Sequence, residues 1–143
     1  MQILGKVRLD NPVGDIGRNL RQIGRKITGV EKGIVENYFA QHQTAKLHIG
    51  CGANTLDGWL NSDLFPNREG ITHLDATATF PFPDATFDYV FSEHMIEHIP
   101  YADGLTMLNE CRRVLKPNGK IRISTPNLQF LIDLYTGNKS ELQ

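Results

Sequence analysis

Short apolar stretches, each bounded by turn-forming residues, recur between residues 46 and 124. Their length and their branched and aromatic residues predict strands at 46–49, 59–64, 71–74, 87–92 and 120–124. Longer segments with helical spacing predict helices at 101–115 and 128–135. The first helix is expected to bury Leu105, Leu108, Cys111 (or the stem of Arg112) and Leu115. This alternation is typical of an α/β domain with a mostly parallel sheet.

The segment 77–86 contains Pro81 and Pro83, which forbid a regular helix there. Its ten residues can extend to roughly 33 Å, which is ample to recross a sheet whose strands lie about 4.8 Å apart. We therefore expect a crossing loop, in which Phe80 and Phe82 serve core and loop packing.

A glycine pair, Gly50 and Gly52, directly follows the first predicted strand. Glycines at the end of a strand let the backbone approach a nucleotide-like ligand, where a Cβ would collide with the ligand or with the turn. The next predicted strand places Asp63 where a carboxylate can accept hydrogen bonds from ribose hydroxyls.

Spacing indicates which ligand this is. The dinucleotide fingerprint needs a third glycine and an acid about 20 residues on, whereas here Asn54 replaces the glycine and Asp63 follows Gly50 by 13 positions. Ten residues separate the two strands and leave room for a helix of one or two turns at most. Because a pyrophosphate is usually held at the start of a long helix, a ligand without phosphates is favoured, and S-adenosylmethionine fits that description.

Five ordered motifs resemble one family. They are Leu-His-Ile-Gly-Cys-Gly at 47–52, Gly-Trp-Leu-Asn-Ser-Asp at 58–63, Phe-Pro-Phe-Pro-Asp-Ala-Thr-Phe-Asp at 80–88, Glu-His-Met-Ile-Glu-His at 93–98 and Leu-Lys-Pro-Asn-Gly-Lys at 115–120. Over residues 46–127 the chain resembles the Rossmann-like S-adenosylmethionine-dependent methyltransferases, and more narrowly their type 11 branch. The resemblance implies the strand order 3-2-1-4-5 with flanking helices. It also implies that closing strands of the family are missing after residue 124, which we interpret as truncation.

The resemblance also implies site residues. A methyltransferase core at 44–143 would bind the cofactor through Gly50, Cys51, Gly52, Asn54, Asp63, Leu64, Asp75, Ala76 and Ser92. Glu93 and His94 would lie beside cofactor and substrate, with His94 the first candidate base because its unperturbed pKa is near neutrality. For Asp75 the alternative is an aspartate that caps its own loop.

Two other functions stay open. The pattern His94-x-x-Glu97-His98 matches an inverted zinc-protease motif, although Pro100 limits the helix and no third ligand is evident. His98 is otherwise expected to bond to backbone. A domain that binds S-adenosylmethionine without catalysis is the second alternative, because a fold and a cofactor site do not establish turnover.

Composition sets broad limits. The chain has 143 residues, 40% of them hydrophobic, and a net charge of −1, which suits one globular core and gives no general attraction for nucleic acid or membrane. Cys51 and Cys111 form neither a disulfide framework nor a zinc motif, so we expect a reducing, cytoplasmic compartment. No apolar run reaches the ~20 residues of a transmembrane segment. The expected partners are a small-molecule or biosynthetic-intermediate acceptor and, through an exposed sheet edge, a second copy.

The first 43 residues are predicted to form a helical cap. Residues 1–42 carry seven basic side chains against four acidic ones, a local charge of +3. An apolar stripe with helical spacing runs through Leu20, Ile23, Ile27, Val30, Ile34 and Tyr38. The alternative to a cap is a docking surface for an anionic substrate or a membrane.

Overall fold

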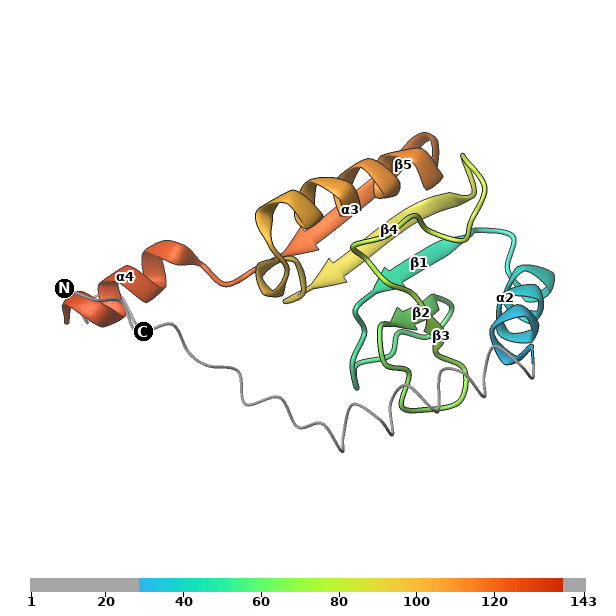
Figure 1. Cartoon of the computed structure of the whole chain (residues 1–143), viewed down its shortest axis with the longest axis horizontal. Helices are drawn as coiled ribbons and strands as arrows, with labels where there is room; N and C mark the ends of the chain where they lie inside the picture. The colour runs from blue at the N-terminus through green and yellow to red at the C-terminus, as the bar shows by residue number, and fades with distance from the viewer. Residues whose placement is uncertain (1–28, 138–143) are drawn as a thin grey trace.

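The computed structural model, which describes residues 29–137, contains one five-stranded parallel sheet (Figure 1). Its strands are β1 (Lys46–Ile49), β2 (Leu60–Asp63), β3 (Thr72–His73), β4 (Phe87–Glu93) and β5 (Leu115–Ser124). They lie in the order β3-β2-β1-β4-β5. The α/β class and the predicted order 3-2-1-4-5 are therefore confirmed.

The strand bounds differ from the predicted ones where turns interfere. β1 matches, while β2 and β3 are shorter than predicted and β4 is one residue longer. β5 begins five residues early because it continues directly from the preceding helix. The pairing with β4 then jumps from Phe87–Leu115 to Tyr89–Lys120, and Asn118 takes a φ of 66° in the intervening irregularity.

Helix α3 (Tyr101–Val114) lies along β4 and β5 (Figure 1). The predicted burial of Cys111 is confirmed, but the rest of the buried face differs from the predicted one. Its buried residues are Gly104, Met107, Cys111 and Val114. Leu105 and Leu108 are instead 46% and 40% exposed, so their predicted burial is wrong, and Leu115 is only partly buried. The buried residues follow one another at spacings of three or four, so they form one helix face, and this face is turned by about one residue from the predicted one.

The strands are joined by two long connections that contain no α-helix. The loop between β1 and β2 runs through turns only, so even the short helix allowed by its length is absent. The loop between β3 and β4 crosses the sheet and buries Phe80 and Phe82, which are 2% and 5% exposed. Both aromatic residues belong to the main core cluster, as predicted.

Helix α2 (Val30–Gln41) packs against the start of the sheet. Buried Tyr38 accepts a hydrogen bond from the Lys46 amide at 2.7 Å and donates to the Lys46 carbonyl at 3.0 Å, which fixes the helix to β1. Leu20, Ile23 and Ile27 of the predicted stripe lie outside the described residues.

Helix α4 (Leu128–Thr136) confirms the predicted helix after the fifth strand and stands apart from the sheet (Figure 1). The Asn127 side chain caps it by accepting from the amides of Gln129 and Phe130. Its apolar side chains are exposed on several sides, with Leu128 at 69% and Tyr135 at 92%. None of the helices described has the length and continuous hydrophobicity needed to cross a bilayer.

Candidate cofactor site at the carboxyl ends of the strands

The glycine loop after β1 has the backbone that its sequence predicts. Gly50 and Gly52 have φ values of +68° and +54°, a region that side chains disfavour. A Cβ added at Gly50 would also collide with the Met95 side chain, whereas one at Gly52 would meet nothing within 4 Å. Gly50 therefore lets the loop after β4 pack closely on the loop after β1.

Asp63, at the end of β2, is oriented by two backbone amides. Its Oδ2 accepts from Gly52 N and its Oδ1 from Phe65 N, each at 2.9 Å. Because each carboxylate oxygen has two lone pairs, both oxygens keep acceptor capacity for further donors. Asp63, the residue predicted to bind the ribose, is thus joined to the glycine loop by a direct hydrogen bond.

Asp75 follows β3 and bonds within its own loop. Its Oδ1 accepts from the Thr77 amide at 2.9 Å and from the Thr77 hydroxyl at 2.7 Å, the loop-capping arrangement that was the alternative for this residue. Ala76 packs against the core. Neither observation tests a contact with adenine.

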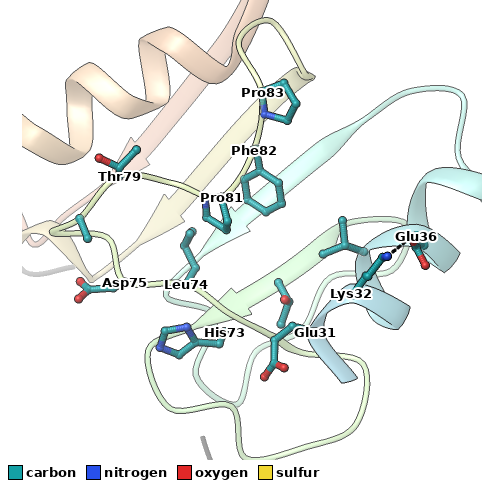
Figure 2. Close-up of a pocket in the computed structure, with 13 residues that line it drawn as sticks. Glu31, Lys32, Glu36, His73, Leu74, Asp75, Thr79, Pro81, Phe82 and Pro83 are labelled. Atoms are coloured by element: carbon teal, nitrogen blue, oxygen red, sulfur yellow. Dashed lines mark ion pairs between the residues drawn. The ribbon is translucent and has the colours of Figure 1, made fainter. Parts of the chain in front are cut away.

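Asp75 also lines a hollow of about 980 Å³ between α2 and the segment 72–83 (Figure 2). Val35 and Phe82 give this hollow apolar walls, and an exposed Lys32–Glu36 ion pair of 3.7 Å lies at its rim. Asp75 is the one predicted site residue among its lining residues. The hollow is therefore distinct from the strand ends where Gly50, Gly52 and Asp63 meet.

Ser92 lies near the end of β4, paired in register with Ile49 of β1. Its side chain is fully buried, and its hydroxyl has no hydrogen-bond partner among the described residues. An unpaired buried hydroxyl is costly, so this atom is suited to a ligand or a water molecule at the end of β4. The neighbouring Glu93 is exposed.

His94 follows β4 in a strained conformation, with a φ of 48°. Its amide donates to Ser124 O at 2.9 Å, and its Nδ1 lies 3.1 Å from Glu97 Oε1. With 56% of its side chain exposed, His94 is accessible to a substrate above the sheet.

The zinc alternative lacks the helix it needs. Ile96–His98 is a single 3-10 turn, and His94 precedes it. Residues 29–137 contain no group of three or more histidine, cysteine, aspartate or glutamate side chains arranged to hold a metal ion. His98 is exposed, and its amide donates to Met95 O at 2.9 Å within that turn.

Three further residues were predicted to bind the cofactor, and they lie in or next to the loops that follow β1 and β2. Cys51 is buried, and burial raises the pKa of its thiol to about 11, with the charge of Asp63 acting in the same direction, so the thiol is no nucleophile at neutral pH. Asn54 is exposed, and its amide closes a turn onto Cys51 O at 2.8 Å. Leu64 is 41% exposed beside Asp63.

The sheet thus joins the end of β1 to the ends of both of its neighbours. Asp63 reaches the glycine loop from β2, and Met95 reaches it from the β4 side. In an open parallel sheet a ligand binds where the strand order reverses, here between β1 and β4. Sequence reasoning missed Met95 and Asn61, and Asn61 gave no separate signal because its neighbours Ser62 and Asp63 in β2 are polar too.

Comparison with known proteins agrees with this geometry. Residues 59–123 match a family described as "Methyltransferase domain" (Methyltransf_11). Residues 59–123 therefore form a class I S-adenosylmethionine-dependent methyltransferase domain. The matched residues include Asp63, Asp75, Ser92, Glu93 and His94, and the cofactor of this methyltransferase family is S-adenosylmethionine.

Similar proteins match this methyltransferase domain over short segments. A probable S-adenosylmethionine-dependent methyltransferase of Mycolicibacterium smegmatis is 44% identical over 50 residues, which are 35% of this chain and 19% of that protein. A demethylmenaquinone methyltransferase of a Geobacillus species is 43% identical over 58 residues, 38% of this chain and 24% of that protein. The chain therefore matches about a fifth to a quarter of the length of these curated relatives.

One solved structure supports the fold. The PH0226 protein of Pyrococcus horikoshii superimposes with a TM-score of 0.55 over 78% of this chain and 62% of that protein, at 22% identity.

The residues present fit S-adenosylmethionine. Gly52 leaves the loop backbone open, Asp63 retains acceptor capacity, and the Ser92 hydroxyl has no partner among the described residues. The β1–β2 loop has no helix whose N-terminus would favour a pyrophosphate.

Proposed function

We propose that this domain binds S-adenosylmethionine at the carboxyl ends of β1, β2 and β4 and transfers its methyl group to a small-molecule acceptor. The main support is the hydrogen bond between Asp63 and the Gly52 amide, which joins the ribose candidate at the end of β2 to the glycine loop after β1, the strand that borders the switch point. In this proposal Gly50, Cys51, Gly52 and Asn54 form the loop that receives the methionine portion. Asp63 and Leu64 contact the ribose, Asp75 and Ala76 lie toward the adenine, and Ser92 supplies the unpaired hydroxyl.

The bound cofactor supplies an activated methyl group on a sulfonium, which a nucleophile displaces in line. The protein's contribution is then mainly alignment of the acceptor, since proximity alone supplies a large part of such a barrier reduction. If the acceptor must lose a proton, His94 Nε2 is the proposed base, because Nδ1 is engaged by Glu97. Glu93, exposed at the end of β4, is the second candidate.

The acceptor is proposed only as a small molecule or biosynthetic intermediate. One relative is named for demethylmenaquinone, which fits that class. A homodimer through β5 also stays a proposal, supported by the unpaired outer edge of β5 within the described sheet. Cys51 and Cys111 are free and buried, in keeping with a reducing cytoplasmic location.

Calorimetric titration with S-adenosylmethionine and S-adenosylhomocysteine tests the cofactor site. We expect saturable binding of both by the full chain and a loss of at least about tenfold in affinity for Asp63→Asn, which keeps the shape but removes the charge. Glu69→Gln, a change at another exposed acid, is the matched control. Absence of binding by the unaltered chain would contradict the proposal.

Turnover is tested separately, by release of S-adenosylhomocysteine in the presence of candidate acceptors. His94→Ala is expected to reduce turnover at saturating cofactor by about 10²-fold or more when the acceptor is protonated. Cofactor binding without turnover for any acceptor would favour the non-catalytic alternative. Normal turnover by His94→Ala would remove the base assignment.

A further inference from the structure

A buried polar pair, His48 and Asn61, lies beneath the loop between β1 and β2. The two residues are direct partners in the β1–β2 register, and they are 3% and 9% exposed. His48 Nδ1 lies 3.1 Å from Asn61 Oδ1. Buried polar side chains in the middle of a sheet need a compensating role, because each costs free energy unless it is hydrogen-bonded.

Both polar atoms of the Asn61 carboxamide form hydrogen bonds, either to the loop or to His48. Its Oδ1 accepts from the Leu56 amide at 2.9 Å, and its Nδ2 donates to Leu56 O at 3.0 Å and to Trp59 O at 3.1 Å. One side chain therefore satisfies three backbone groups of a loop that has no helix to satisfy them.

The bonding of Asn61 also sets the state of His48. Since Asn61 Oδ1 is fixed as an acceptor by the Leu56 amide, the bond to His48 requires a proton on Nδ1. Burial lowers the pKa of His48, so the ring is the neutral Nδ1–H tautomer. On its other side the ring packs on Phe91 of β4, with ring centres 5.1 Å apart.

The same loop is closed at its other end by the candidate cofactor residues. Gly52 N donates to Asp63, and Cys51 N donates to Ser62 O at 3.0 Å. Asn61 and Asp63 are two residues apart in β2, so both side chains lie on one face of the sheet. The glycine loop is thus held at its start by Asp63 and at its end by Asn61.

We propose that Asn61, oriented by His48, is a positioning residue for cofactor binding. Its hydrogen bonds hold the backbone of the 51–59 loop in place, as the helix after the first strand does in a dinucleotide-binding fold. It acts through the loop and need not touch the ligand. This inference rests on the proposed function for its cofactor, but the ordering of the loop is measurable without any ligand.

The experiment compares Asn61→Ala with Ser62→Ala by calorimetry with S-adenosylhomocysteine and by thermal unfolding. Ser62 is the matched control: it is buried in the same strand, and its hydroxyl bonds to His48 O at 2.8 Å rather than to the loop. We expect Asn61→Ala to weaken binding by about tenfold or more, because three loop hydrogen bonds are lost, and Ser62→Ala to leave affinity within about twofold at similar loss of thermal stability.

A pair of changes at His48 covers the case in which Asn61→Ala does not fold. His48→Gln can donate a hydrogen bond to Asn61 Oδ1, whereas His48→Leu cannot. We expect His48→Gln to retain affinity within about threefold and His48→Leu to lose about tenfold. Equal affinities for the two variants would overturn the role of His48.

Amide hydrogen exchange of the 51–59 segment separates this inference from the proposed function. Faster exchange of that segment in Asn61→Ala than in Ser62→Ala supports the positioning role even if the unaltered chain binds no cofactor. Unchanged exchange, or unchanged affinity in a variant that folds, would overturn it.

Discussion

Two long loops cross the ends of this sheet without an α-helix, and they differ in where charged groups hold them. The 51–59 loop is bonded at its start by the charged Asp63 and Arg68, but its end is held by a neutral, buried amide and imidazole from β2 and β1. The 75–86 loop is held by charged side chains of α3 that are partly exposed. The same structural need, pairing of loop backbone groups, is therefore met by buried neutral groups at the end of the first loop and by charged groups in the second.

Arg113 is the centre of the charged arrangement. Its guanidinium donates to Phe82 O at 2.8 Å and to Phe80 O at 3.1 Å, while Glu110 accepts from the Phe80 amide at 2.7 Å. Arg113 and Glu110 also pair with each other at 2.6 Å. This pairing holds the pKa of Glu110 below its ordinary value. We expect this loop to respond to acid and salt, and the 51–59 loop to respond to loss of packing.

The largest effect is expected from removal of the charged anchor. Arg113→Ala should lower the free energy of unfolding by about 4 kcal/mol, because Glu110 and two loop carbonyls lose their donor while only partly exposed. Urea unfolding measures this change. Arg112→Ala, at the exposed neighbouring position, is the control and should cost less than about 0.5 kcal/mol. Similar costs for the two would show that charge does not hold the 75–86 loop.

Arg113 and Glu110 can hold the 75–86 loop only if α3 itself is packed firmly on the sheet through its buried face. Met107→Ala, at a fully buried position, should cost about 3 kcal/mol through the cavity it leaves. Leu108→Ala should cost about 1 kcal/mol or less, because Leu108 is 40% exposed. Urea midpoints decide between them, and a larger loss at Leu108 would restore the helix face that the sequence predicts.

A smaller effect is expected at the start of the 51–59 loop, where Gly50 packs against Met95. Gly50→Ala should cost about 2 kcal/mol, from a positive φ together with the contact with Met95. Gly52→Ala has the positive φ but open space around it, and about 1 kcal/mol is expected. If thermal unfolding gave equal losses, the close approach of the two loops would have no energetic weight.

The smallest effect is expected in how the stability of the two loops depends on pH. His48 has a folded pKa below its ordinary 6.5, so the unfolded state binds its proton first and stability falls as the pH drops below about 6.5. Glu110 has a folded pKa below its ordinary 4.5, so its contribution is complete above about pH 4.5 and is lost on further acidification toward the folded pKa.

Amide hydrogen exchange as a function of pH, corrected for intrinsic rates, should therefore show the 51–59 loop loosening before the 75–86 loop. In His48→Gln the earlier change should disappear while the later one stays. Simultaneous loosening of both loops would mean that the two anchors are not independent.

The family resemblance was sufficient for the strand order, and local signals read one strand at a time were sufficient to place the glycine pair, Asp63 and the segment after Phe91 at strand ends. The sequence was insufficient where the outcome depends on neighbours. Counting large apolar residues favoured Leu105 and Leu108, but α3 packs on the sheet through the neighbouring face, which contains Gly104 and Met107.

Pairs of side chains on neighbouring strands could not be predicted from the sequence either. His48 lies between two apolar residues of β1, Asn61 lies among the polar residues of β2, and only the register of β1 on β2 makes them partners. Arg113 has the same limitation, since its loop partners lie about thirty residues earlier in the chain. For Asp75 the sequence left two roles open, and its bond to Thr77 shows that the loop-capping arrangement is formed.

Trp59 gives the 51–59 loop an optical signal of its own. It is the single tryptophan of the whole sequence, and it lies edge-on to Phe91 with ring centres 6.1 Å apart, with the Lys46 ammonium 5.5 Å from its ring. Its fluorescence, excited apart from the tyrosines, therefore comes from that loop alone. Ordering or release of the loop can be followed by emission in the unlabelled protein, in real time.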